Sequence, residues 1–149
     1  MVDIDKELGP LFDKLKKEGK LERYRKRDQN TKDEYNEFKD ICDALIAPQM
    51  RDYQRYLRKK GVYSDIVREP KIESTTIPNP SISFVLTDLN LISPQGVYPS
   101  IKFTLEGGKI LETITGKTTF SIEYLKNQIT PELVADKLAN LIKSCFEML

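Results

Sequence analysis

The residues with the most obvious binding chemistry are the cations between positions 14 and 27. This stretch holds eight Lys and Arg residues, and the only acids within it are Glu18 and Glu22. A dense run of cations can neutralise phosphates, and the ring of Tyr24 within the run could stack on a base. The residues that we expect to carry such binding are Lys20, Arg23, Arg25, Lys26 and Arg27.

The charge of the whole chain argues against nucleic-acid binding. The 24 Lys and Arg residues are balanced by 23 Asp and Glu residues, so the net charge is +1 and no global field attracts nucleic acid or an anionic membrane. The acids Asp28, Asp33 and Glu34 also follow the basic run closely. An intramolecular or solvated role for these cations is therefore favoured, and nucleic-acid binding is the alternative.

A pair of tyrosines is the second candidate site. Tyr53 and Tyr56 are three residues apart beside Leu57, a spacing that makes side chains neighbours on a helix surface. Tyrosine is enriched among the hot-spot residues that contribute most of the binding energy of protein interfaces. The favoured alternative is contact with the core or the sheet, with the hydroxyl groups reaching water. We name Tyr53 and Tyr56 as the candidate protein-binding residues.

The chain lacks the residues that most catalytic and metal-binding sites require. The chain has no histidine, which excludes Ser–His and Cys–His nucleophilic sites and histidine metal ligands. Cys42 and Cys145 are too few for a thiolate zinc site, and both fall at apolar positions of predicted helices, where a reduced thiol packs as a small hydrophobe. We expect no disulfide framework, no bound metal and no cofactor.

Two patterns resemble sites but are better explained as structure. Gly116-Lys117-Thr118 ends like a phosphate loop, yet the first glycine of that motif would fall at Leu111, so we expect a hairpin turn. A run of helical acids lies opposite an apolar stripe, which is typical of a solvated face. These acids are Asp33, Glu34, Glu37, Asp40 and Asp43. No segment indicates a carboxylate desolvated in a pocket, as acid–base catalysis needs, and we expect that the protein is not an enzyme.

The elements that must position these residues include a sheet. Ile101, Phe103 and Leu105 alternate with polar residues, Gly107-Gly108 provides a tight turn, and residues 109–115 return as a second strand. Alternation resumes over residues 119–125, with Phe120, Ile122 and Tyr124 on one face. The pattern predicts a three-stranded meander over 99–125 whose apolar face helices must cover. Further strands are expected at 62–67 and from 81, separated by a loop over 70–80.

Helical spacing surrounds this sheet in the sequence. A first helix is expected over residues 2–17, either kinked by Gly9-Pro10 or starting at Pro10, and its apolar residues are Leu8, Leu11, Phe12 and Leu15. A second, long helix has Asn30 or Thr31 as its expected N-cap and a stripe that crosses Pro48, which should bend the helix or divide it near Ala47. Thr130-Pro131-Glu132 begins the last helix.

These patterns predict an α+β fold. It has N-terminal helices, one of them long and kinked near Pro48, an antiparallel sheet of about five strands that includes the 99–125 meander, and a C-terminal helix packed on one sheet face. The length of 149 residues suits a single domain over 1–149, with residues 1–28 as a candidate for a loosely docked basic helical arm. No apolar run approaches a bilayer span and the N-terminus lacks signal-peptide features, so we expect a cytoplasmic protein without a membrane partner.

The function that these observations favour is a small non-enzymatic protein-binding or adaptor module, whose partner is another protein or its own copy. The missing catalytic residues and the edge strands of the meander both point in that direction. The alternative is a nucleic-acid-binding protein that uses the basic segment 14–27. A pocket for a small molecule between sheet and helices is a third interpretation, and no residue constellation favours it.

Overall fold

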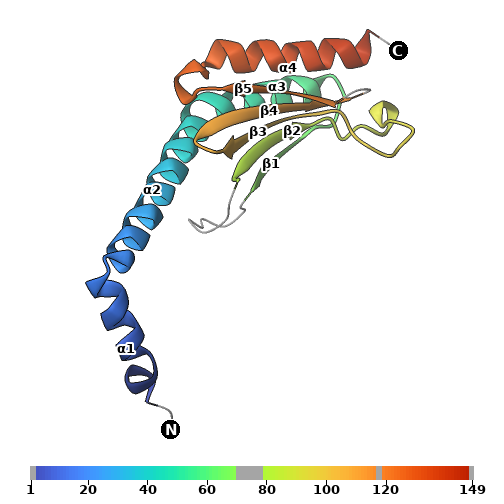
Figure 1. The fold of residues 1–149 in the computed structure, drawn as a ribbon. Coiled ribbons are helices and arrows are strands. Elements are labelled where there is room, and N and C mark those ends of the chain that lie inside the picture. Colours follow the sequence, from blue (N-terminus) through green and yellow to red (C-terminus); the bar gives the residue numbers. More distant parts are fainter. Residues whose placement is uncertain (1–2, 70–78, 117–118, 148–149) are drawn as a thin grey trace. The chain divides into compact units, whose positions relative to one another are not determined.

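The computed structural model describes residues 3–69, 79–116 and 119–147, which form two compact units, one ending at Glu34 and the other beginning at Tyr35. The helices are α1 (Ile4–Lys17), α2 (Lys20–Ile41), α3 (Ala47–Lys59) and α4 (Pro131–Phe146), with a π-helical turn (Cys42–Ile46) before α3 (Figure 1). The strands are β1 (Asp65–Glu69), β2 (Ser81–Val85), β3 (Ser100–Glu106), β4 (Lys109–Thr115) and β5 (Thr119–Tyr124). Most of the predicted 70–80 loop and part of the predicted Gly116-Lys117 turn lie outside the described residues. The predicted single domain with a docked arm over 1–28 stays a prediction.

Helix α1 begins at Ile4, because the side chain of Asp3 caps its first turn. The Asp3 Oδ1 atom accepts a hydrogen bond from the Lys6 N–H at 3.3 Å. Pro10 lies inside α1, so the alternative start at Pro10 is wrong. The helix ends at Lys17, since Gly19 takes a φ of 69°, which glycine adopts without a steric penalty.

The predicted start of the second helix is wrong. Helix α2 begins at Lys20, and both Asn30 and Thr31 lie inside it. The residues from 20 to 29 are mostly Leu, Glu, Arg, Lys and Gln, all of which favour helix. Their combined preference outweighs the capping tendency of the two later residues.

The predicted interruption near Pro48 is a π-helical turn over Cys42–Ile46, in which the Ala47 N–H donates to the Cys42 carbonyl. Pro48 has no N–H to donate, and its ring crowds the preceding helical turn. The wider π turn accommodates the ring, and α3 starts at Ala47 with the proline in its first turn. The prediction of two helical segments that meet near Ala47 is confirmed.

Helix α3 ends with a glycine motif that shifts the next strand. Gly61 has a φ of 80°, its N–H donates to the Arg58 carbonyl at 3.1 Å, and the Val62 N–H donates to the Leu57 carbonyl at 2.9 Å. These bonds hold Val62 against the helix end. Strand β1 therefore begins at Asp65 and not at Val62 as predicted.

The five strands form one antiparallel sheet in the order β1-β2-β3-β4-β5, and α3 and α4 lie on the same side of it (Figure 1). Thr130 caps α4 by accepting the Leu133 N–H at 3.1 Å, as predicted. The largest buried side chains between the sheet and the helices include Met50, Ile82, Phe84, Phe103 and Leu138, all with 0% exposure. The predicted α+β class, with a helix-covered antiparallel sheet, is confirmed.

The helical cover does not reach the whole apolar face. Phe120 stands opposite Ile114 at the β5 edge, on the face predicted to be covered, yet its exposed fraction is 51%. Leu125, which follows β5, is 52% exposed. The edge strand therefore presents apolar side chains next to unpaired backbone groups.

Two tertiary ion pairs use acids that the sequence placed on a solvated face. Arg68 of β1 donates to Asp43 Oδ1 at 2.5 Å and to the Lys39 carbonyl at 3.3 Å. Lys126 donates to Glu37 Oε2 at 2.9 Å. Both contacts connect the end of the long helical region to the sheet side of the C-terminal unit, so these acids do more than contact water.

The burial of Cys42 makes a prediction that labelling can test. Cys42 is 1% exposed, and burial raises the pKa of its thiol to about 12, so neither access nor ionisation favours reaction at pH 8. Cys145 is half-buried, and burial raises the pKa of its thiol as well. We expect a maleimide to modify Cys145 first and to reach Cys42 only as the protein unfolds, as read by mass spectrometry with and without urea. Equal labelling rates for the two thiols in the folded protein would contradict the packing of the π turn.

Candidate interaction surfaces

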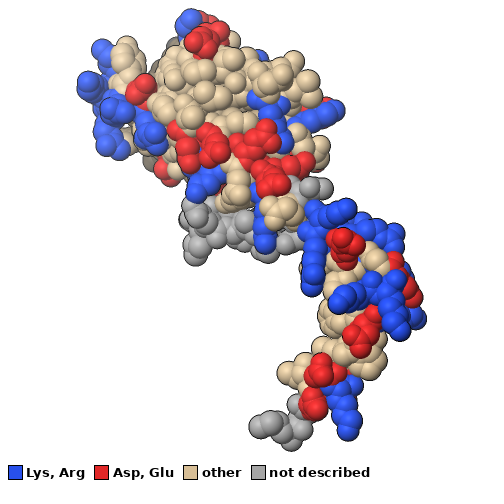
Figure 2. Space-filling view, turned by 90° about the vertical axis from the view of Figure 1, so that its left-hand side faces the viewer, with Lys and Arg blue, Asp and Glu red and all other residues tan. Residues whose placement is uncertain are grey.

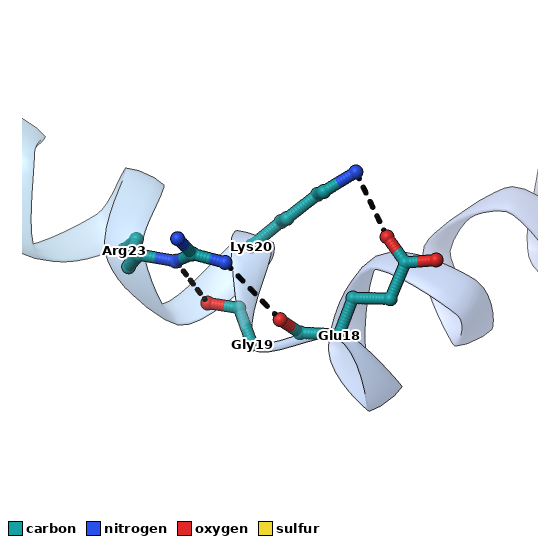
Figure 3. Close-up of polar contacts among 4 residues, drawn as sticks. All are labelled: Glu18, Gly19, Lys20 and Arg23. Atoms are coloured by element: carbon teal, nitrogen blue, oxygen red, sulfur yellow. Dashed lines mark hydrogen bonds and ion pairs between the residues drawn. The ribbon is translucent and has the colours of Figure 1, made fainter.

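The basic residues Lys20 and Arg23 take part in the joint between α1 and α2 (Figure 3). Lys20 Nζ lies 2.9 Å from Glu18 Oε2, and the Arg23 guanidinium donates to the carbonyls of Glu18 at 3.2 Å and Gly19 at 3.4 Å. A cation on the last carbonyls of a helix satisfies acceptors that otherwise need water. Two of the five cations predicted to bind nucleic acid therefore have local structural partners.

The other predicted nucleic-acid residues do not form one stripe. Arg25, Lys26 and Arg27 are exposed on α2, and among the described contacts Arg25 and Lys26 make no hydrogen bond or ion pair. At about 100° of helical rotation per residue, Arg25 points away from Lys20 while Arg27 returns toward it. Figure 2 shows Lys and Arg mixed with Asp and Glu over the N-terminal helices. By the same rotation, Lys20, Arg23, Lys26 and Arg27 lie within about 120° of one another on α2, whereas Arg25 points away from them.

Helix α1 carries an apolar stripe that the sequence analysis did not identify as a site. None of its residues is buried, and its large apolar side chains are exposed by 69% (Ile4), 45% (Leu8), 50% (Leu11) and 47% (Phe12). Leu15, at the end of the same stripe, is half-buried. The three-and-four spacing was visible in the sequence, but the pattern alone does not say whether a core covers it.

The two candidate protein-binding tyrosines do not act together. Tyr53 is half-buried and packs against the hydrophobic core, whereas Tyr56 is 60% exposed. The Lys60 ammonium lies 5.6 Å from the centroid of the Tyr56 ring, in the range of a cation–π contact. Tyr53 therefore contacts the core, as the favoured alternative predicts. Tyr56 is the tyrosine of the pair that is accessible to a partner.

A shallow apolar groove lies where the ends of α3 and α4 meet. Its volume is about 430 Å³, and Leu57, Val62, Ile142 and Phe146 form its apolar part. Lys60, Lys143 and Glu147 complete its lining. The sequence pattern does not reveal this groove, because the two helix ends are more than 80 residues apart in the chain.

The structure also buries a carboxylate, which the sequence analysis did not expect. Glu112 of β4 stands opposite Phe103 and Ile122, on the helix-covered face, and is 0% exposed. Lys137 of α4 places Nζ 3.5 Å from Glu112 Oε1, and the Tyr124 hydroxyl donates to Oε2 at 3.3 Å. Its position between Ile110 and Ile114 was the signal that could have located it, since alternate residues share a face.

Burial sets the protonation of this cluster. Burial raises the pKa of Glu112 above its ordinary value, and the ion pair with Lys137 together with the Tyr124 hydrogen bond opposes that rise only in part. Burial and the Glu112 charge also raise the pKa of Tyr124. Among the described residues, Glu112 Oε1 has no hydrogen-bond partner besides this ion pair. Glu112 has no exposed surface, whereas Lys137 and Tyr124 are half-buried and connect it to the protein surface.

In the described ranges 3–69, 79–116 and 119–147, no group of three or more Cys, Asp or Glu side chains is arranged to hold a metal ion. No helix in these ranges combines the length and the apolar character needed to cross a bilayer.

The buried ion pair predicts a strong, pH-dependent effect of removing its cation. Lys137→Met leaves the Glu112 carboxylate buried without its counter-charge, and we expect a loss of about 3 kcal/mol in the free energy of unfolding at pH 7. The loss should shrink near pH 4, where protonation removes the charge. Lys143→Met, at an exposed position of the same helix, is the matched control and should change stability by less than about 0.5 kcal/mol.

The wild-type protein gives the sign of the pH effect. Because the Glu112 pKa is raised by folding, the folded state holds this proton where the unfolded chain has released it, so the Glu112 contribution to stability falls as pH rises from about 4.5 through the folded pKa. Urea unfolding from pH 4 to pH 8 measures this slope, which Glu112→Gln should remove. An unchanged slope in that variant, or no difference between the two lysine variants, would show that the pair is not buried.

The chain matches no protein-family model, no curated protein and no solved structure. Neither the basic segment nor the apolar surfaces can therefore be assigned by similarity.

Proposed function

We propose that the protein is a non-enzymatic protein-binding module and that α1 is its contact element. The observation that carries this proposal is the apolar stripe of α1, on which Ile4, Leu8, Leu11 and Phe12 are each at least 45% exposed. Single exposed apolar residues are ordinary in soluble proteins, but a contiguous set on one helix face is typical of an interaction site. Recognition of an amphipathic helix uses anchors at this three-and-four spacing.

The polar side of α1 favours a protein over a lipid surface as the partner. Helices that lie on anionic membranes carry mainly Lys and Arg on their polar face. In α1 the acids Asp5, Glu7 and Asp13 nearly balance the four lysines of the helix, so its polar face is not predominantly cationic. A protein partner can match such a mixed pattern with charges of its own.

The absence of catalytic activity remains part of this proposal. Glu112 is the carboxylate with the most altered environment among the described residues, yet it has no exposed surface and already contacts Lys137 and Tyr124. A substrate could not touch it without rearrangement of the core. The exposed acidic and basic residues described above lie on helix surfaces or form ion pairs. This arrangement supports a role in binding.

Photo-crosslinking tests the proposal. We expect benzoylphenylalanine in place of Phe12 to crosslink the full chain to another polypeptide chain in the expressing cell, because position 12 lies on the apolar face. The same residue at Asp13, which is exposed on the polar face, is the matched control and should give no specific adduct. Adducts are identified by mass spectrometry. Position 12 adducts that occur only within one chain, or only with lipid, would refute the proposal.

Nucleic-acid binding is the second candidate, and the exposed, unpaired Arg25 and Lys26 are the observation in its favour. If these cations contact phosphates, Arg25→Ala with Lys26→Ala should reduce the slope of log affinity against log salt by about 2 on duplex DNA. Lys59→Ala with Lys143→Ala removes two other exposed cations as a control. Fluorescence anisotropy with a mixed oligonucleotide provides the measurement. No binding at low salt, or the same loss in both variants, would exclude a site in the basic segment.

A further inference from the structure

The spacing of the α1 stripe is that of a helix pair. Ile4, Leu8, Leu11 and Leu15 are separated by four, three and four residues, which is the seam of a two-stranded coiled coil. Phe12 lies beside the seam. Gly9 and Pro10, the two residues that weaken a helix most, fall outside the seam positions, so neither replaces an apolar seam side chain, and α1 continues through both residues.

The charges of α1 divide along its length. The acids Asp3, Asp5 and Glu7 occupy the first half, and the second half ends in three lysines, which are Lys14, Lys16 and Lys17. Two residues break this division, Lys6 and Asp13. They are seven residues apart and stand on the side opposite the seam, where they would not face a partner helix.

We infer that the apolar face of α1 is covered by α1 of a second copy, running in the opposite direction. The inference rests on the proposed protein-binding function and names the partner. A parallel copy would bring the two acidic halves together and the two basic halves together, which is unfavourable. An antiparallel copy places acids against lysines at both ends, and the two-fold symmetry repeats every contact.

The antiparallel register follows from the seam. Ile4 stands opposite Leu15 of the second copy, and Leu8 opposite Leu11 of the second copy. Glu7 and Lys14 flank the seam on the same side, each one residue before a seam leucine. In this register Glu7 lies beside Lys14 of the second copy, twice per dimer. The contact is smaller than a standard interface, so the dimer is weak and depends on concentration.

Sedimentation equilibrium of the full chain from about 10 µM to 1 mM tests the inference. Glu7→Lys and Lys14→Glu each place like charges across both symmetric contacts and should raise the dissociation constant roughly three- to tenfold. Mixing the two variants should restore association, because each heterodimer then pairs Lys with Glu at both sites. Lys6→Glu with Asp13→Lys exchanges charges on the far side of the helix and is the matched control, with no change expected.

A disulfide trap tests the direction of the pair. In a Cys145→Ser background, Glu7→Cys and Lys14→Cys are combined and the protein is oxidised. Residues seven apart on one helix are separated by about 10 Å along its axis, which is too far for a disulfide within one chain. Bonds between position 7 of one copy and position 14 of the other, identified in peptides by mass spectrometry, are expected. Bonds that join 7 to 7 and 14 to 14 would overturn the antiparallel arrangement.

The remaining outcomes separate this inference from the proposed function. A monomer at every concentration would overturn the inference. So would a dimer whose dissociation constant is the same in the wild type and in the Glu7→Lys and Lys14→Glu variants. If position 12 nevertheless crosslinks to a different protein, the protein-binding proposal stands and the second copy is excluded. A monomer that sediments with anionic phospholipid vesicles would show that lipid covers the stripe, and both proposals would fail.

Discussion

The apolar face of the open antiparallel sheet must be removed from water, and the C-terminal unit is built around that requirement. The sheet contributes large side chains such as Phe84 and Phe103, and α3, α4 and the π turn supply the other side of the core. Several local features serve this cover. The π turn accommodates Pro48 while keeping Cys42 and Ile46 in the core, the glycine at 61 stops α3, and Thr130 starts α4. Each of these sets where a helix begins or ends over the sheet.

A charged group takes part in this otherwise apolar layer. Glu112 costs free energy to bury, and its contact with Lys137 offsets only part of that cost, so the pair is weak evidence for stability. It does restrict the fold. A slip of one residue in the pairing of β3 with β4 would move Glu112 to the solvated face and bring its polar neighbour Thr113 into the core. A shift of α4 would take Lys137 away from the carboxylate. The pair therefore makes one register of β4 and α4 more favourable than its neighbours.

The N-terminal unit differs, because it consists of helices and none of its described side chains is buried. The first part of α2 is mostly polar, and its cations Lys20 and Arg23 contact the joint with α1. Helix α1 has an apolar stripe, and none of its residues is buried. An amphipathic helix without a core normally gains its stability by packing against something else. The apolar stripe of α1 is exposed, and the charges of the helix divide into an acidic half and a basic half. These two features are the basis of the proposed protein-binding role.

Local pattern was sufficient to predict much of the fold. Alternation located β2 to β5, and capping residues predicted the start of α4 and the end of α3, because the pleat and the helix termini impose their own residue preferences. Weak capping signals failed where stronger helix formers surrounded them, as at Asn30. Tertiary structure decided the rest. Whether a stripe such as that of α1 is covered, which of Tyr53 and Tyr56 faces the core, and that Glu112 meets Lys137 all depend on contacts between residues distant in the chain. A one-dimensional pattern shows which faces are apolar or charged, but burial is a property of what packs against them.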